Sequence, residues 1–204
     1  LLGRKLEKLD ARADTLRAQL SDLGLADRGA IIDTLALDFA DMESVRRAAD
    51  EARDRFPAID GLILSVVALL QNGPNMLPNG HELMFATNVL GPFLFTQLLL
   101  DRLRQANGLV LHVVATHHED VDWDDLESIK RHKTGDAYNR TKTMHRALAA
   151  ELARRTGGKP SSVAFNPGFT IDKDDPDLAE RWPEGFMGLF WSAMTSLFAK
   201  PPEG

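Results

Sequence analysis

The feature that most constrains the fold is a set of short, continuously apolar runs separated by segments of helical periodicity. The runs lie at about 30–37, 59–67, 110–115 and 162–165. Strands that are apolar throughout are typical of parallel sheets covered by helices. The predicted helices lie at about 5–22, 42–55, 81–105, 136–156 and 176–199. This alternation predicts an α/β fold with a doubly wound, Rossmann-like parallel sheet and helices on both faces.

Local signals refine the ends of these elements. Within 81–105, Gly91-Pro92 predicts a bend, because proline interrupts the helical hydrogen bonds. The helix at 136–156 should stop at Gly157-Gly158. The polar stretch 117–135 is predicted to be a surface loop, and its acidic run Asp120–Asp125 is expected to face solvent.

Composition excludes several classes of protein. The chain has 204 residues, with 24 basic and 30 acidic side chains and no cysteine. The acidic balance argues against nucleic acid as a partner, and the lack of cysteine excludes disulfides and thiolate catalysis. A run of 18 apolar residues, which would predict an integral membrane segment, does not occur. We therefore expect a cytoplasmic protein, consistent with a reducing compartment.

The residues with the clearest chemistry are Tyr138, the only tyrosine, and Lys142. Their spacing of four places both side chains on one face of the predicted helix. A nearby ammonium lowers the pKa of a phenol by favouring the phenolate. Tyr138 is therefore predicted to act as a general acid/base. The alternative is an exposed helical pair without a function.

Several ordered segments resemble the short-chain dehydrogenase/reductase family. They are Leu37-Asp38, Asp60-Gly61-Leu62-Ile63-Leu64, Thr87-Asn88-Val89-Leu90-Gly91, Asp136-Ala137-Tyr138 with Lys142, and Asn166-Pro167-Gly168. The loop from His117 to Leu126 is similar to the retinol-dehydrogenase-like and protochlorophyllide-reductase-like branch. The resemblance extends from residue 1 to about residue 200.

The resemblance implies NADP(H)-dependent hydride transfer between a hydrophobic alcohol and a carbonyl, in specialised metabolism. It assigns proton transfer to Tyr138, the tuning of Tyr138 and the nicotinamide ribose to Lys142, and a water relay to Asn88. The other cofactor-binding residues that it implies are Arg4, Asp38, Ser65, Val66, Pro167, Gly168 and Thr170. Arg4 suits a 2′-phosphate because guanidinium binds phosphate bidentately. A small-molecule substrate and a homo-oligomer are the implied partners.

The sequence also departs from the family. Its glycines form no phosphate-binding loop, so the resemblance implies that the first strand is missing and that the single domain at 1–204 is incomplete at both ends. Thr116 is the hydroxyl nearest to the position of the family's catalytic serine. Val67 replaces a small residue, and Asp172 replaces a threonine. These changes keep a second hypothesis open: an acid/base enzyme of the cyclase or isomerase type, or a pseudoenzyme, without redox activity.

Two remaining features are weighed differently. His117 and His118 lie in a polar loop, where contact with solvent or substrate is favoured over a metal site, and no metal is predicted. The apolar stretch 186–198 is interpreted as a helix packed on the core. A substrate lid and binding to a membrane surface are the alternatives.

Overall fold

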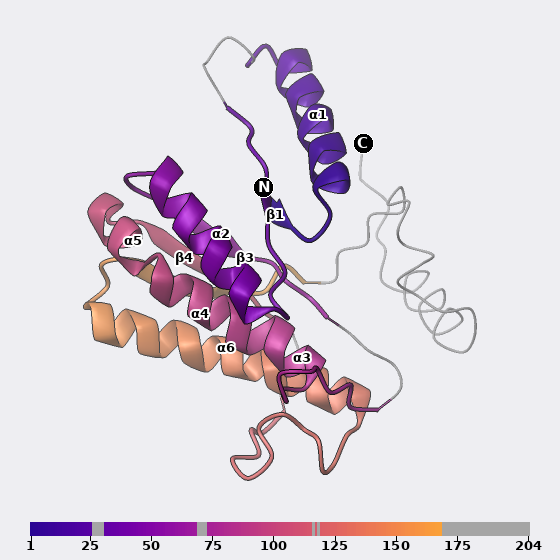
Figure 1. The fold of residues 1–204 in the computed structure, drawn as a ribbon. Coiled ribbons are helices and arrows are strands. Elements are labelled where there is room, and N and C mark those ends of the chain that lie inside the picture. Colours follow the sequence, from indigo (N-terminus) through magenta and orange to yellow (C-terminus); the bar gives the residue numbers. More distant parts are fainter. Residues whose placement is uncertain (26–30, 69–72, 116, 118, 169–204) are drawn as a thin grey trace, which may run out of the picture. The chain divides into compact units, whose positions relative to one another are not determined.

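The structure is a computed structural model that describes residues 1–25, 31–68, 73–115, 117 and 119–168. The chain divides into two compact units, Leu1–Pro167 and Gly168–Gly204. All elements described below belong to the first unit (Figure 1). Thr116, His118, Thr170, Asp172 and the apolar stretch 186–198 lie outside the described residues.

The strands and helices alternate along the first unit, as the sequence predicts. The strands are β1 (Leu2–Gly3), β2 (Leu35–Ala36), β3 (Gly61–Leu64), β4 (Leu109–Val113) and β5 (Ser161–Phe165). The helices are α1 (Leu6–Asp22), α2 (Met42–Arg55), α3 (Leu83–Phe85), α4 (Gly91–Leu98), α5 (Leu100–Ala106) and α6 (Thr134–Thr156). A π-helical turn, η2 (Ala86–Leu90), joins α3 to α4.

Every strand pair is parallel, which confirms the predicted α/β class. β1 pairs with β2, and β3, β4 and β5 form a second sheet with β4 in the centre. The helices α2, α4 and α6 lie on one side of the strands, and α1 lies on the opposite side (Figure 1). This arrangement is that of a Rossmann-like fold.

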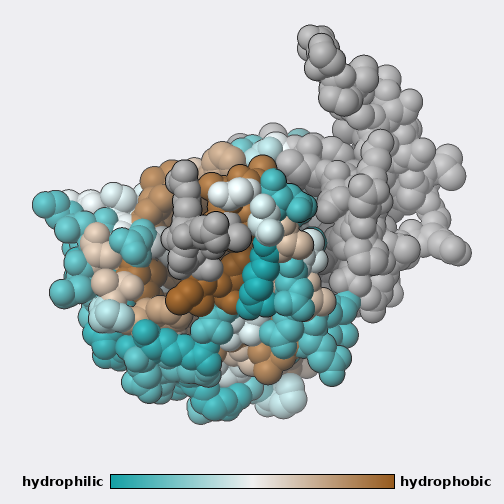
Figure 2. Space-filling view, turned by 90° about the horizontal axis from the view of Figure 1, so that it is seen from above, coloured by the Kyte–Doolittle hydropathy of each residue, from teal (hydrophilic) through white to brown (hydrophobic). Residues whose placement is uncertain are grey.

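The hydrophobic core lies between the strands and the helices on the side of α2, α4 and α6. Its members are buried side chains, including Leu35, Val45, Leu62, Phe95 and Val110. On the other face of the larger sheet, Ile63 is 65% exposed and Phe165 is 47% exposed. Figure 2 shows that hydrophobic residues gather on the face seen from above.

The two sheets are separated where a doubly wound sheet would have a further strand between them. The carbonyls of Leu1 and Gly3 accept hydrogen bonds from the amides of Leu35 and Leu37, so the N–H and C=O groups of Leu2 face away from β2. Among the described strands, none joins β1 to β3. The gap lies where the family resemblance predicts a further strand.

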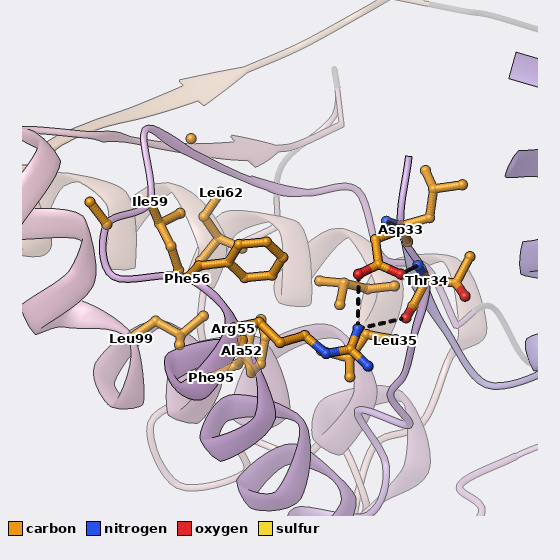
Figure 3. A pocket seen from close by; sticks show the side chains of 14 residues that line it. Asp33, Thr34, Leu35, Ala52, Arg55, Phe56, Ile59, Leu62, Phe95 and Leu99 are labelled. Atoms are coloured by element: carbon orange, nitrogen blue, oxygen red, sulfur yellow. Dashed lines mark hydrogen bonds and ion pairs between the residues drawn. The ribbon is translucent and has the colours of Figure 1, made fainter. Parts of the chain in front are cut away.

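A cavity of about 250 Å³ lies in this gap (Figure 3). Leu2 and Leu35 line it on one side, and Ile59 and Leu62 line it on the other. At its rim, Arg55 Nη1 donates to Asp33 Oδ2 and to the Thr34 carbonyl, each at 3.2 Å. The cavity is therefore an apolar gap in the sheet and is not lined by Tyr138 or Lys142.

The helix predicted at 81–105 differs from the structure. Its axis bends by 59° between Leu98 and Leu100, and not at Gly91-Pro92. Pro92 is the second residue of α4, and its missing N–H removes the bond that the Asn88 carbonyl would accept in a continuous α-helix. The π-helical turn immediately before it absorbs the irregularity.

Candidate functional site

The candidate site lies along α6, where Tyr138, Thr141, Lys142 and His145 follow one another at helical spacing. Side chains at i, i+3, i+4 and i+7 share one face of a helix. The face points toward the strands, because Thr141, Lys142 and His145 are all buried and α6 packs on β4, β5 and η2. Polar side chains on an inward-facing stripe need polar partners, and the strand ends provide them.

Lys142 is only 2% exposed, yet its ammonium is well bonded. Its Nζ donates to the carbonyl of Val66 at 3.0 Å and to the carbonyl of Val113 at 3.2 Å. Val113 ends β4, and Val66 follows β3 by two residues. Burial lowers the pKa of Lys142 to about 8, because desolvation disfavours the charged form. The ammonium therefore joins the carboxyl ends of two adjacent strands.

Tyr138 is half-buried, and the Nζ of Lys142 lies 5.7 Å from the centroid of its ring. Burial raises the pKa of the Tyr138 phenol. This is opposite to the lowering expected from a neighbouring ammonium. Desolvation is the stronger effect here, and the charge of Lys142 is shared with the Val66 and Val113 carbonyls.

Asn88 is fully buried in η2 and connects three segments. Its Oδ1 accepts from the amide of Ala68 at 2.6 Å, and its Nδ2 donates to the Ala68 carbonyl at 2.9 Å. The same Nδ2 donates to Thr141 Oγ1 at 3.2 Å, and that hydroxyl donates to the Tyr138 carbonyl at 2.7 Å. The structure thus places Asn88, Lys142 and Tyr138 around the segment that follows β3.

Two buried histidines next to this site were not singled out from the sequence. His145 of α6 is fully buried, His112 of β4 is 4% exposed, and their ring centroids lie 5.6 Å apart. His145 Nε2 is bonded to the backbone carbonyl of Asn88. Burial lowers the pKa of His112 to about 4. Burial, together with the nearby charge of Lys142, lowers the pKa of His145 to about 3.

The remaining predicted cofactor residues follow strand ends, where ligands bind in open α/β sheets. Arg4 is exposed one residue after β1, and Ser65 is exposed directly after β3. Pro167 and Gly168 are exposed after β5, and Gly168 has φ +74°. Asp38 follows β2, but its Oδ1 accepts from the Ala40 amide at 2.9 Å, which ties one carboxylate oxygen into its own turn.

The loop between β4 and α6 contains a buried carboxylate, although its acidic sequence predicted exposure to solvent. Asp125 was expected to face solvent, but it is only 8% exposed. Its carboxylate accepts from the amides of Ile129, Lys130 and Arg131 at 2.9, 3.0 and 3.2 Å. Burial by itself would raise the pKa of Asp125, but these backbone donors bring it below its ordinary value. The carboxylate is therefore a structural anchor for the loop.

Glu127 of the same loop binds the turn that precedes α3. Its Oε2 accepts from the Glu82 amide at 2.6 Å, and its Oε1 lies 3.1 Å from His81 Nδ1. His117 is exposed. Among the described residues, no three His, Asp or Glu side chains are placed to hold a metal ion together.

Within the described part of the chain, no single helix is both long and apolar enough to cross a membrane. The bent pair Leu83–Leu98 and Leu100–Ala106 meets those criteria only when its two helices are counted together.

Comparison with known proteins identifies a consistent set of relatives. A family model described as short chain dehydrogenase matches residues 3–122. A short-chain dehydrogenase/reductase of Armillaria gallica is 33% identical over 145 residues, which cover 66% of this chain and 47% of that protein. Human retinol dehydrogenase 14 is 32% identical over 137 residues, which cover 65% of this chain and 40% of that protein. The chain therefore spans about half the length of these relatives, or less.

Solved structures show the same fold at low sequence identity. L-Sorbose reductase from Gluconobacter frateurii, complexed with NADPH and L-sorbose, is 17% identical with a TM-score of 0.63, covering 85% of this chain and 60% of that chain. A gluconate 5-dehydrogenase from Burkholderia cenocepacia, in complex with NADP and tartrate, is 21% identical with a TM-score of 0.58, covering 84% of this chain and 61% of that chain.

Proposed function

This chain belongs to the short-chain dehydrogenase family. We propose that it acts as an NADP(H)-dependent oxidoreductase that interconverts a hydrophobic alcohol and a carbonyl compound. The observation that carries this proposal is the placement of Lys142. Its buried ammonium joins the ends of β3 and β4 and lies 5.7 Å from the Tyr138 ring. A fixed cation beside a phenol at the carboxyl edge of a parallel sheet suits proton transfer to a bound carbonyl.

The described residues offer contacts for the nicotinamide ribose and for the 2′-phosphate of the cofactor. An ammonium has three N–H donors, and Lys142 uses two of them on the Val66 and Val113 carbonyls. We assign the third to a ribose hydroxyl on the nicotinamide side, with exposed Ser65 after β3 and exposed Pro167 after β5 at the neighbouring strand ends. Arg4 is assigned to the 2′-phosphate, because it is exposed at the end of β1. The 204 residues contain no glycine-rich loop for the pyrophosphate.

The proposed proton transfer uses Tyr138 and its neighbours. The raised pKa keeps the proton on Tyr138 Oη at neutral pH, which suits donation to a carbonyl oxygen during reduction. When bound, NADPH would supply the hydride for this reaction. Lys142 is mainly charged at pH 7, because its pKa lies near 8, and it stabilises negative charge that develops on the phenol oxygen. Asn88 holds the segment after β3 in place through Ala68.

The substrate is proposed to be a lipophilic alcohol or carbonyl compound. Human relatives of this chain are named retinol dehydrogenases, and retinol is a hydrophobic alcohol. The loop between β4 and α6 presents apolar side chains that could contact such a molecule, since Trp123 is 79% exposed and Ile129 is 40% exposed. This loop is anchored by Asp125, so these side chains are carried on an ordered segment.

A second candidate function is acid/base catalysis without hydride transfer. It is favoured by the segment after β4, where Val114 and Ala115 leave no hydroxyl to polarise a carbonyl before residue 116. The exposed Val67 also adds bulk where the backbone would approach a cofactor. Such an enzyme would still use Tyr138 as its proton donor.

Titration with NADPH, followed by fluorescence, tests the proposed function. Wild-type protein is expected to bind in the micromolar range, and Lys142→Met to bind at least about tenfold more weakly through loss of a charge-assisted hydrogen bond. Lys130→Met is the matched control, because Lys130 is an exposed lysine whose Nζ also donates to a backbone carbonyl. Equal affinities for the wild type and Lys142→Met would refute the assignment of Lys142.

The cofactor preference and the second candidate need separate comparisons. Arg4→Ala is expected to weaken binding of NADPH but not of NADH, because only NADPH carries the 2′-phosphate. Tyr138→Phe is expected to bind NADPH normally and to lose turnover of lipophilic carbonyl compounds. Wild-type protein that folds but binds neither nucleotide would favour the acid/base candidate.

A further inference from the structure

The backbone around Asn88 contains a carbonyl that an ordinary helix could not satisfy. In an α-helix, the carbonyl of Asn88 would accept from the amide of residue 92. Residue 92 is proline, which has no N–H and whose ring clashes with the carbonyl four residues earlier. The chain forms a π-helical turn at this point, where the amide of Gly91 bonds to the carbonyl of Ala86. The carbonyl of Asn88 therefore lacks the i+4 donor that an α-helix would provide.

His145 supplies a donor to this carbonyl from the neighbouring helix α6. Its Nε2 is bonded to the Asn88 carbonyl. A carbonyl oxygen only accepts, so the proton of the neutral imidazole must be on Nε2 and the lone pair on Nδ1. His145 and Asn88 are both fully buried, so water does not compete for this bond. A buried carbonyl left without a donor would be costly.

The rest of the ring has no comparable polar contact. His145 Nδ1 and both ring nitrogens of His112 are buried without a hydrogen-bond partner among the described residues. The two rings meet edge to face at 5.6 Å, as an aromatic pair in a core. The Nε2 bond to Asn88 thus distinguishes His145 from His112, and it accounts for a polar residue at this buried position.

Fixing the backbone of Asn88 also fixes its side chain. That side chain pairs with both the amide and the carbonyl of Ala68, two residues beyond the Val66 carbonyl that binds Lys142. It also bonds to Thr141, one residue before Lys142. We propose that His145 is a positioning residue that holds Asn88, and through Asn88 the segment after β3, in register with Lys142. The inference rests on the proposed function for its catalytic consequence but not for its geometry.

Three variants separate this role from ordinary core packing. His145→Leu removes the donor, and His145→Gln keeps an N–H donor near the position of Nε2. His112→Leu is the matched control, because it replaces the neighbouring buried imidazole, which makes no bond to Asn88. The readout is the rate of hydrogen exchange of the Ala68 amide, measured by NMR, because this amide donates to Asn88 Oδ1. The reference is the Val114 amide, which donates to Phe165 in the sheet at 2.9 Å.

His145→Leu is expected to speed exchange at Ala68 relative to Val114 by about tenfold or more, the loss of one net hydrogen bond. His145→Gln should restore most of the protection, and His112→Leu should leave the ratio unchanged. The KM for NADPH is expected to rise in His145→Leu and to recover in His145→Gln. Equal exchange ratios in His145→Leu and His112→Leu, or no recovery with glutamine, would overturn the proposal.

Two further measurements keep the test decisive. If His145→Leu does not fold, the ¹⁵N spectrum of the wild-type imidazole replaces it: the Nε2–H tautomer supports the proposal, and the Nδ1–H tautomer overturns it. If wild-type protein binds no NADPH, the proposed function fails, while the exchange ratios still decide whether His145 positions Asn88.

Discussion

Replacing Gly91 with alanine is expected to destabilise the protein, although alanine is the better helix former. Gly91 is buried at the start of α4. A Cβ added there would lie 2.3 Å from the carbonyl oxygen of Phe39 and 2.9 Å from its Cβ. These are backbone-linked atoms that cannot rotate away, and the Phe39 ring packs edge to face on Phe95 with centroids 5.9 Å apart. Relief requires the loop after β2 to move away from α4.

The expected size follows from two opposing effects. Overpacking a well-filled site typically costs about 1–3 kcal/mol, and more where backbone must shift. The gain in helix propensity from glycine to alanine offsets about 1 kcal/mol. Gly135→Ala in α6 is the matched control, because no atom lies within 4 Å of its added Cβ and only the propensity gain remains. We expect Gly91→Ala to be less stable than Gly135→Ala by about 2–3 kcal/mol.

Urea unfolding followed by circular dichroism measures this difference. For a chain of this size, about 2–3 kcal/mol corresponds to a difference in Tm of about 4–12 °C. Gly135→Ala should be at least as stable as the wild type. If Gly91→Ala unfolds at the same urea concentration as Gly135→Ala or at a higher one, the expected clash between the added Cβ and Phe39 is refuted.

Three other predictions concern buried polar groups. His112→Leu is expected to be as stable as the wild type or more so in urea unfolding, because both ring nitrogens are buried without partners, and a loss above about 2 kcal/mol would contradict this. The lowered pKa of His112 means that the unfolded chain binds more protons below pH 6.5, so His112 alone should lower the stability by about 3 kcal/mol between pH 6.5 and about 4. His145 adds to the fall over the same range, and His112→Leu should show a flatter pH dependence than the wild type. Asp125→Ala should lose about 1–3 kcal/mol through three unsatisfied amides, whereas Asp124→Ala at an exposed position should not; equal unfolding midpoints would refute the anchoring role.

The sequence predicted the elements well where local signals were strong. Asp41 caps α2 through the Glu43 amide, and the helix occupies Met42–Arg55 as expected. β1 and β2 are only two residues long, although the apolar run at 30–37 predicted a longer strand. Pairing with neighbouring strands determines where a strand ends. The gap between β1 and β3 leaves β1 paired only with β2. Periodicity along the chain does not contain that information.

The helix at 81–105 shows a different limit. Gly91-Pro92 was the obvious place for a bend, but the backbone bends beyond Leu98. Glycine at 91 instead permits the close approach of Phe39, and the effect of Pro92 appears as the π-helical turn. Both outcomes depend on which element packs beside the helix, which no local pattern specifies.

For the site, the family and its retinol-dehydrogenase-like branch were predictable from ordered motifs, and the comparisons confirm both. The spacing of Tyr138 and Lys142 indicated one helix face, and the structure adds the partners of Lys142. His145 was missed because a single histidine in a predicted helix is usually a core residue without a function. Its place seven residues after Tyr138, together with a proline four residues after Asn88, was the available signal.

We propose that Tyr138 and Lys142 support hydride transfer between NADP(H) and a lipophilic carbonyl compound. The most direct measurement incubates the protein with NADPH that carries deuterium at both C4 positions and with a long-chain aldehyde, and measures the mass of the alcohol product by mass spectrometry. One deuterium is expected in the alcohol with wild-type protein and none with Tyr138→Phe. Bound NADPH without deuterium transfer, or equal transfer by Tyr138→Phe, would contradict it.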